Sequence, residues 1–229
     1  VLQDGRKIDV VRITHVHGDH FAYLPAFASY LSKDAKVWMT RPSTGMAQSI
    51  LQEGLKIAGK TGDPPPYDYL EMCDILERIE IIERPGEHQI VPGFTDYVDP
   101  AGHIHGACSF TTRVRGVNIE YPGDWCGHDQ PGVRGRRPKE ASWRPRVLAG
   151  SDCTYGADKD SDRRSWKEEM DRGFDVCVET YRRGHPVIWF SFGVHREGAI
   201  AAELARRGLP ELCPVYLDGA GREFTKLMM

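Results

Sequence analysis

The segment ITHVHGDHF, residues 13–21, concentrates side chains that bind metal ions. Four of its residues are potential ligands within six positions: His15, His17, Asp19 and His20. Imidazole nitrogens and carboxylate oxygens are the ligands that zinc accepts where thiolates are absent. His15 and His17 are two residues apart, so in an extended segment their side chains point the same way and grip one ion. Asp19 and His20 follow in a turn, where they face a second ion.

A pair of metal ions is typical of hydrolytic enzymes, because one ion polarises the electrophile and a water between the ions loses its proton near neutral pH. Such a centre needs more ligands than one segment supplies. His103 in GHIHGA and Asp124 in YPGD each lie at a glycine-bounded turn after a predicted strand. Turns of this kind carry the functional side chains of many β scaffolds. His105, two residues after His103, is the alternative ligand from the same turn.

The elements around these residues alternate between strand and helix, which predicts an α/β fold. The expected strands are residues 8–15, 36–40, 146–156, 185–193 and 214–219, with several short ones between 88 and 125. The expected helices are residues 21–31, 43–59, 161–183 and 196–208, with Pro25 in the first turns of the first helix and Ser43 as the N-cap of the second. Residues 69–82 are expected to form a helix that runs into a strand. The last strand, helix and strand predict a parallel unit.

The composition limits the classes of protein that the chain represents. Its 229 residues are 40% hydrophobic and carry a formal net charge of −3. Binding of nucleic acid would therefore depend on a local basic patch. The six cysteines form no CxxC pair, which predicts reduced thiols and a cytoplasmic location. No apolar run approaches the roughly 20 residues of a membrane span, and no signal peptide is recognisable. The opening without a methionine suggests that residue 1 is not the native start.

One basic segment, residues 127–146, follows directly on Asp124. It has six basic residues against two acidic ones: Arg134, Arg136, Arg137, Lys139, Arg144 and Arg146 against Asp129 and Glu140. We expect these basic side chains to hold phosphates near the metal site. Trp143 would offer a stacking face to an unpaired base. The alternative is a solvated loop without a ligand.

Several motifs resemble those of a known superfamily. THVHGDH is similar to the HxHxDH signature of the metallo-β-lactamase superfamily, and GHIHGA and YPGD resemble its later turns. SDCTYG (151–156) and PVYLDG (214–219) resemble motifs of its β-CASP nuclease branch. The resemblance implies a metallo-β-lactamase αββα sandwich over residues 1–160. The start of a β-CASP α/β domain would follow over residues 161–229.

The resemblance also implies roles for individual residues. His15, His17 and His103 would hold one zinc ion, Asp19 and His20 would hold the other, and Asp124 would bridge them. Asp152 would orient a ligand histidine or help to manage the proton of the attacking water, so Asp19 and Asp152 are the expected catalytic carboxylates. The implied activity is phosphodiester hydrolysis by a hydroxide that two Zn²⁺ ions activate, with Mn²⁺ or Mg²⁺ as substitutes. The expected substrate is nucleic acid, and single-stranded RNA is favoured over DNA.

Two other functions compete with this one: a small-molecule metallo-hydrolase such as a lactonase or thioesterase, and a non-catalytic scaffold subunit of an RNA-processing complex. The chain also departs from the family pattern, because the family's GRxQE reads HREGA and its later histidines are missing. We therefore expect the chain to be a fragment of a longer protein, one half of a split protein or a degenerate paralogue. In the first two cases the rest of the protein, or a protein partner, would supply those histidines. The alternative within the chain is that His185 or His195 substitutes for one of them.

Overall fold

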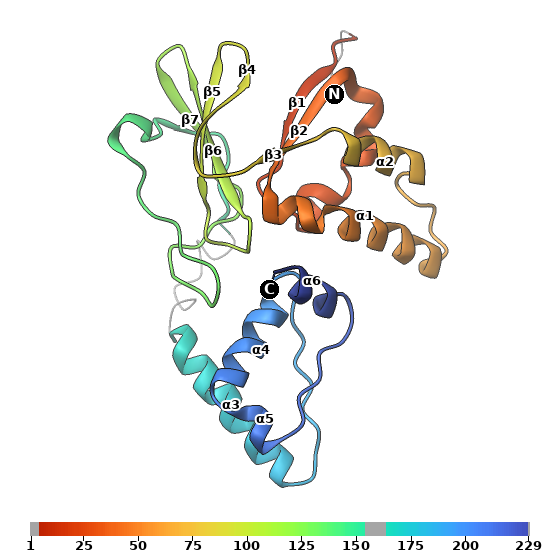
Figure 1. Ribbon diagram of the computed structural model, residues 1–229, viewed down its shortest axis with the longest axis vertical. Helices are drawn as coiled ribbons and strands as arrows, with labels where there is room; N and C mark the ends of the chain where they lie inside the picture. The colour runs from red at the N-terminus through yellow and green to blue at the C-terminus, as the bar shows by residue number, and fades with distance from the viewer. Residues whose placement is uncertain (1–4, 154–163, 229) are drawn as a thin grey trace. The chain divides into compact units, whose positions relative to one another are not determined.

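The computed structural model describes residues 5–153 and 164–228 (Figure 1). The chain divides into two compact units. The first comprises Val1–Gly127 and Gly135–Asp152, and the second comprises His128–Arg134 and Cys153–Met229. The predicted domain boundary at residue 160, and the TYG part of the SDCTYG motif, lie outside the described residues. The mixture of helices with parallel and antiparallel strands confirms the α/β class.

The first unit begins with a parallel sheet of three strands in the order β1-β2-β3. These strands are β1 (Ile8–Arg12), β2 (Leu31–Thr40) and β3 (Ile79–Ile82). Parallel neighbours need crossover connections. Two short helical turns, η1 (Gly18–Ala22) and η2 (Leu24–Tyr30), connect the first pair, while α1 (Arg41–Thr61) and α2 (Tyr69–Glu77) connect the second. The carboxyl end of β1 therefore leads straight into the histidine motif.

Two of the predicted helices differ in detail from the structure. Residues 21–31 do not form one α-helix, because the chain makes a π-helical turn over η1 and then a 3₁₀ helix over η2, with Pro25 in its first turn. α1 begins before the predicted N-cap, so that Ser43 is a buried residue of its first turn. The helix that runs into a strand over 69–82 is confirmed, and Asp68 forms a reciprocal capping box with Glu71.

The second sheet of this unit has five strands in the order β4-β5-β6-β7-β8. They are β4 (Gly86–Val91), β5 (Phe94–Pro100), β6 (Cys108–Val114), β7 (Val117–Tyr121) and β8 (Val147–Leu148). β4 to β7 pair antiparallel, and β8 adds to β7 in parallel. The short strands predicted between 88 and 125 are therefore confirmed. Of the strand predicted over 146–156, residues 146–153 are described, and two of these form a strand.

The two sheets lie next to each other, and polar contacts connect them (Figure 1). The Arg12 guanidinium at the end of β1 donates to Asp96 at 2.8 Å and to Thr112 at 2.5 Å, both on the five-stranded sheet. Just beyond β1, the Thr14 carbonyl accepts a hydrogen bond from the backbone N–H of Cys108 at 2.8 Å. These bonds hold the histidine motif against the loop that precedes β6.

The second unit is helical in its described residues. It contains α3 (Trp166–Arg182), α4 (Arg196–Arg206), α5 (Leu209–Leu212) and α6 (Ala220–Met228). Its buried cluster comprises Met170, Cys177, Leu204, Leu209 and Cys213. The predicted helices around 161–183 and 196–208 correspond to α3 and α4.

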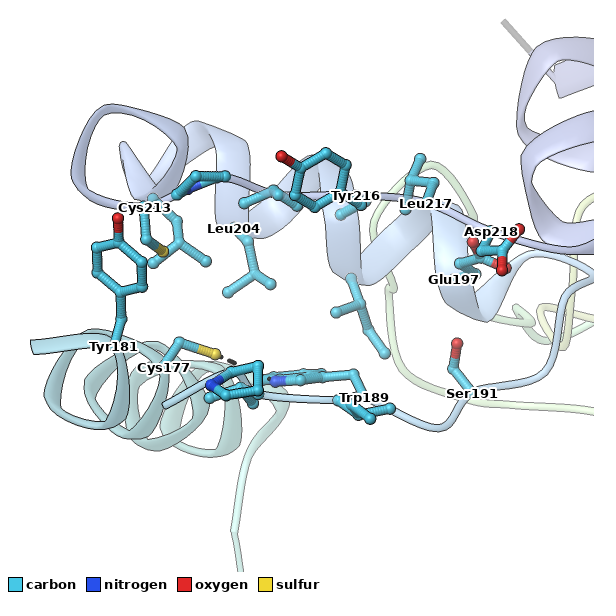
Figure 2. Close-up of a pocket in the computed structure, with 18 of the residues that line it drawn as sticks. Cys177, Tyr181, Trp189, Ser191, Glu197, Leu204, Cys213, Tyr216, Leu217 and Asp218 are labelled. Atoms are coloured by element: carbon cyan, nitrogen blue, oxygen red, sulfur yellow. Dashed lines mark hydrogen bonds between the residues drawn. The ribbon is translucent and has the colours of Figure 1, made fainter. Parts of the chain in front are cut away.

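The strands predicted over 185–193 and 214–219 are wrong for the described part of this unit, which contains no strand. A strand needs a neighbour for its backbone hydrogen bonds, and these segments have none there. Their apolar side chains instead line a cavity of about 590 Å³ beside α3 and α4 (Figure 2). Phe190 is 95% exposed. The predicted parallel strand–helix–strand unit is therefore not formed.

Candidate metal centre

Three loops of the first unit meet at the histidine motif. The segment after β1 is fixed by the N–H of Ile13, which donates to the carbonyl of Trp38, and by the Thr14–Cys108 bond. The loop before β6 is closed on itself by the bond from the Ala101 N–H to the Ala107 carbonyl. The loop after β7 is tied to it by the Cys126 N–H, which donates to the Ala101 carbonyl. The backbone thus brings together residues about 110 positions apart in the sequence.

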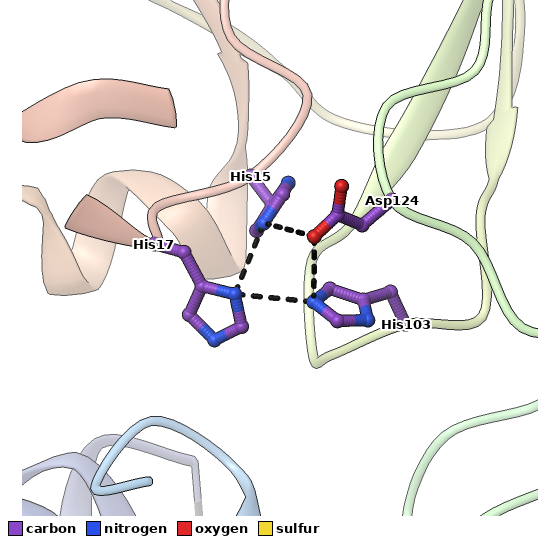
Figure 3. A group of neighbouring side chains, drawn as sticks. All are labelled: His15, His17, His103 and Asp124. Atoms are coloured by element: carbon purple, nitrogen blue, oxygen red, sulfur yellow. Dashed lines mark hydrogen bonds and ion pairs between the residues drawn. The ribbon is translucent and has the colours of Figure 1, made fainter. Parts of the chain in front are cut away.

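Four side chains from these loops direct ligand atoms at one point (Figure 3). His17 Nδ1 lies 3.1 Å from His15 Nε2 and 3.1 Å from His103 Nε2. Asp124 Oδ2 lies 3.4 Å from His103 Nε2 and 3.7 Å from His15 Nε2. All four ligand atoms lie within 4.8 Å of one another. The structure therefore brings together His15, His17, His103 and Asp124, whereas His105 is not a member of this cluster.

The spacing of these atoms fits a divalent cation. Donors at about 2.0–2.1 Å from a zinc ion in tetrahedral geometry are about 3.3 Å apart, close to the neighbouring distances in this cluster. Three imidazole nitrogens and one carboxylate oxygen form a donor set that zinc accepts. Lone pairs that converge this closely repel one another unless a cation lies between them. The cluster therefore has the chemistry and the dimensions of a metal site.

The second predicted set of ligands lies on the other side of Asp124. His20 Nε2 is 3.3 Å from Asp124 Oδ1 and 3.6 Å from Asp19 Oδ2. Asp124 therefore turns one carboxylate oxygen towards His15 and His103 and the other towards His20. Asp19 is far more open than the first cluster, with 79% of its side chain exposed. The geometry allows Asp124 to bridge two ions.

Thr14 contacts histidines of both predicted ligand sets, and the sequence did not single it out. Its Oγ1 lies 3.2 Å from Nδ1 of His15 and 3.4 Å from Nδ1 of His20. An Nδ1–H that donates to this oxygen leaves Nε2 of the same ring with a lone pair for a metal ion. One hydroxyl thus lies within hydrogen-bond distance of a histidine in each ligand set. Its position directly before His15 in THVHGDH was the available signal.

Two glycines hold the loops at close approach, both with positive φ. A Cβ on Gly123 (φ +61°) would lie 2.6 Å from the Cβ of Thr14. A Cβ on Gly102 (φ +76°) would lie 2.4 Å from the carbonyl oxygen of Cys126. Only glycine fits these positions without displacing a neighbour. The glycines in YPGD and GHIHGA therefore allow the loops of the metal cluster to pack against one another.

Burial keeps two of the histidines neutral in the metal-free protein. Loss of solvent, followed by repulsion from His20, His17 and His103, lowers the pKa of His15 to about 2. Loss of solvent and repulsion from His103 lower the pKa of His17 to about 4, against the attraction of Asp19 and Asp124. A metal ligand must carry a free lone pair. Both rings are therefore unprotonated at neutral pH and ready to bind a cation.

The structure contradicts the predicted phosphate-binding role of Lys139. Its ammonium group is buried, where it forms an ion pair with Asp99 and another with Glu120 at 3.1 Å. Arg136 donates to the same buried Glu120 at 2.5 Å, although its side chain stays partly exposed. Buried carboxylates require such partners. This part of the basic segment is thus attached to the five-stranded sheet.

Trp143 is also misassigned as a base-stacking residue. It is only 2% exposed, its ring stacks on Tyr97, and the Arg113 guanidinium covers it at 4.0 Å from the ring centroid. Its indole N–H donates to Glu87 at 2.9 Å. Both faces of the ring are therefore occupied by the protein. The exposed tryptophan of this region is Trp125, which the sequence reasoning passed over although it directly follows Asp124.

The remaining predicted residues lie outside the metal cluster. Arg137, Arg144 and Arg146 are exposed on the first unit, and Arg134 is exposed on the second unit. Asp152 is half-buried, and Ser151 next to it accepts a hydrogen bond from the indole of Trp125. His185 and His195 belong to the second unit. None of the described helices has the length and apolar character to cross a membrane.

Several curated proteins are similar to this chain. Endoribonuclease ysh1 of Schizosaccharomyces pombe is 28% identical over 196 residues, which are 84% of this chain and 25% of that protein. Cleavage and polyadenylation specificity factor subunit 3-I of Arabidopsis thaliana is 30% identical over 133 residues, 57% of this chain and 19% of that protein. RNase aCSPSF2 of Saccharolobus solfataricus is 25% identical over 225 residues, 97% of this chain and 43% of that protein.

These relatives confirm the resemblance to the metallo-β-lactamase β-CASP ribonucleases. The chain spans less than half the length of each of the three. No family model matches it. Among solved structures, a protein of unknown function from Enterococcus faecalis V583 aligns with 52% of this chain and 25% of its own at a TM-score of 0.36 and 17% identity, too low to assign a fold.

Proposed function

We propose that this relative of the β-CASP ribonucleases hydrolyses phosphodiester bonds in RNA at the metal centre of its first unit. The observation that supports this most is the convergence of His15, His17, His103 and Asp124 on one point, with the second oxygen of Asp124 facing His20. Two of the relatives are named as ribonucleases. An intact first ligand set, in which burial keeps His15 and His17 unprotonated, is expected of an enzyme rather than of a scaffold.

Two divalent ions, zinc in the first instance, would occupy the centre. His15, His17 and His103 would hold the first, Asp19 and His20 would hold the second, and Asp124 would hold both. When bound, the ions supply Lewis-acid stabilisation of a phosphoryl oxygen and lower the pKa of an attacking water. The donor set also accepts Mn²⁺, whereas Mg²⁺ prefers oxygen ligands and would bind less well.

The protein's own residues would orient the ligand histidines, keep water away from them and bind the RNA. Thr14 would keep His15 and His20 in the tautomer that presents Nε2. The buried position of His15 keeps water from competing for its nitrogen. Asp152 would orient a ligand histidine or accept a proton from the attacking water. Its neighbour Ser151 accepts a hydrogen bond from the indole of Trp125, the residue after Asp124, which places this segment near the centre. The exposed Arg137, Arg144 and Arg146 would contact phosphates of the bound strand.

The proposal extends to the fold of the first unit and to the rest of the protein. The two adjacent sheets would be the β layers of the proposed αββα sandwich of the metallo-β-lactamase superfamily, and α1 and α2, beside the three-stranded sheet, would belong to one helical layer. The second unit corresponds to the start of a β-CASP domain. We propose that the histidine that completes the second metal site comes from a longer form of the protein or from a partner protein.

The test is cleavage of 5′-end-labelled single-stranded RNA and DNA by the full-length protein. Asp19→Ala and Asp124→Ala should abolish cleavage, and Asp124→Ala should also lower the zinc content measured by mass spectrometry. Asp63→Ala, an exposed carboxylate in the loop after α1, is the matched control and should cleave normally. Cleavage that survives both active-site substitutions would refute the two-metal mechanism. A wild-type protein that binds zinc and cuts neither polymer would favour the scaffold.

A further inference from the structure

Trp125 is an exposed aromatic residue beside the metal centre. It is the neighbour of the ligand Asp124 in the sequence, so their Cα atoms are about 3.8 Å apart. Its side chain is 42% exposed, whereas Trp143 in the same part of the chain is 2% exposed. Exposure of one apolar side chain is ordinary by itself. The informative feature is that this partly exposed ring directly follows a residue of the metal cluster.

The indole of Trp125 is held in place on one edge and one face. Its N–H donates to Ser151 Oγ at 3.4 Å, and Ser151 in turn donates to the carbonyl of Asp152 at 3.2 Å. The Arg136 guanidinium lies 5.6 Å from the ring centroid, within the range of a cation–π contact. Arg136 is itself anchored to the buried Glu120. The ring is thus fixed before any ligand arrives, which lowers the entropic cost of binding.

We propose that the indole of Trp125 stacks on an unpaired base of the RNA next to the phosphate at the metal centre. This inference rests on the proposed function and specifies how the site selects its substrate. Every base has a π-face, so stacking on an aromatic residue tolerates any sequence but requires a base that is free of its duplex partner. Trp125 therefore favours single-stranded RNA over a duplex without reading a particular base.

The surroundings of Trp125 favour a polyanion over an apolar protein surface. Arg137 is exposed, and its guanidinium donates to the carbonyl of Gly127, two residues after Trp125, at 3.4 Å. Arg136 lies against the ring. A nucleotide offers an aromatic base for the indole and a phosphate for the exposed guanidinium of Arg137. That guanidinium would have to be desolvated under an apolar partner.

The test combines variants of the full-length protein with RNAs that lack single bases. Trp125→Ala, Trp125→Phe and the buried control Trp143→Phe are assayed on a single-stranded RNA, and on versions with one abasic nucleotide moved stepwise across the cleavage site. Trp125→Ala should lower kcat/KM on the intact RNA by roughly 5- to 150-fold, the size of one base–aromatic stack. Trp125→Phe should retain most of the activity, because it keeps an aromatic face.

The abasic series separates stacking from a structural role. On the RNA that lacks the stacked base, wild type and Trp125→Ala should have equal kcat/KM, while Trp143→Phe should change all RNAs by one common factor. A loss in Trp125→Ala that is the same on every abasic RNA, or no loss on any, would overturn the inference. Binding of the same RNAs, followed by fluorescence anisotropy, allows the same comparison without cleavage. A wild-type protein that does not cut RNA would therefore refute the proposed function. The binding comparison would still confirm or overturn the stacking inference.

Discussion

The hydroxyl oxygen of Thr14 lies 3.2 Å from Nδ1 of His15, the ring nitrogen opposite the one that faces the metal cluster. Removing this contact should leave the ligand set intact but free its rings to rotate. We expect Thr14→Val, which keeps the shape of the side chain and loses the oxygen, to weaken zinc binding by about 10- to 100-fold. Competition with a chromogenic chelator measures the affinity. Thr14→Ser keeps the hydroxyl and should bind zinc like the wild type; equal affinities in all three proteins would contradict the positioning role.

Gly123 should tolerate no side chain, because an added Cβ would lie 2.6 Å from the Cβ of Thr14. We expect Gly123→Ala to displace Thr14, to lower zinc occupancy and to lower the free energy of unfolding by about 1–3 kcal/mol, as positive φ and overpacking combine. Gly116→Ala is the matched control, since Gly116 has φ +80° and no atom within 4 Å of an added Cβ.

Urea denaturation and zinc analysis of both glycine variants provide the measurement. The control should lose stability from backbone strain alone and keep its full zinc content. A Gly123→Ala protein with normal zinc content would show that Thr14 does not depend on the close approach of the two loops.

The metal cluster was predictable from the sequence because its information is local. His15, His17, Asp19 and His20 stand together in one motif, and His103 and Asp124 each lie in a short turn between strands. The sequence did not predict the contacts that hold the ligand histidines in their orientations. The contact between Thr14 and His15 had only a weak signal, the position of the threonine before the motif, because a threonine before a histidine has many structural roles.

The basic segment misled the sequence reasoning because burial of a charge depends on distant partners. Lys139 pairs with Asp99 and Glu120, and Trp143 packs on Tyr97, through the antiparallel strands of the second sheet. A run of basic residues in a sequence is compatible with a solvated loop until those partners are placed. The strand predicted over 185–193 was wrong for a related reason: β-propensity does not supply a neighbouring strand.

The stability of the metal-free protein should fall as the pH drops below about 6.5. The pKa of His15 is lowered to about 2 and that of His17 to about 4, so the unfolded chain takes up protons that the folded one refuses. Stability is therefore complete above the unfolded pKa and is lost progressively towards pH 4 for His17 and towards pH 2 for His15. Each refused proton costs at most about 1.4 kcal/mol per pH unit, and less for the more exposed His17.

Urea denaturation in EDTA at several pH values measures this slope. Because carboxylates also titrate there, the informative quantity is the difference between wild type and His17→Gln. We expect the variant to have the shallower slope between pH 6.5 and 4. Parallel curves would mean that His17 accepts a proton in the folded protein as readily as in the unfolded one.

Lys139 and Arg144 should behave in opposite ways, although both belong to the same basic segment. Lys139→Met leaves the carboxylates of Asp99 and Glu120 without their buried ammonium partner, so we expect it to lower the free energy of unfolding by about 3–5 kcal/mol. Arg144 is exposed, and Arg144→Ala should change stability by less than about 0.5 kcal/mol. Urea denaturation of the two variants tests this half of the prediction.

RNA binding tests the other half. If Arg144 contacts a phosphate, Arg144→Ala should reduce the slope of log affinity against log salt by about one counterion. Lys139→Met, measured under conditions in which the variant is folded, should leave that slope unchanged, because the ammonium group of Lys139 in the wild type is buried. A reduced salt slope in Lys139→Met would mean that the ion pairs with Asp99 and Glu120 open when RNA binds. The basic segment would then act as the phosphate-binding loop that its composition suggests.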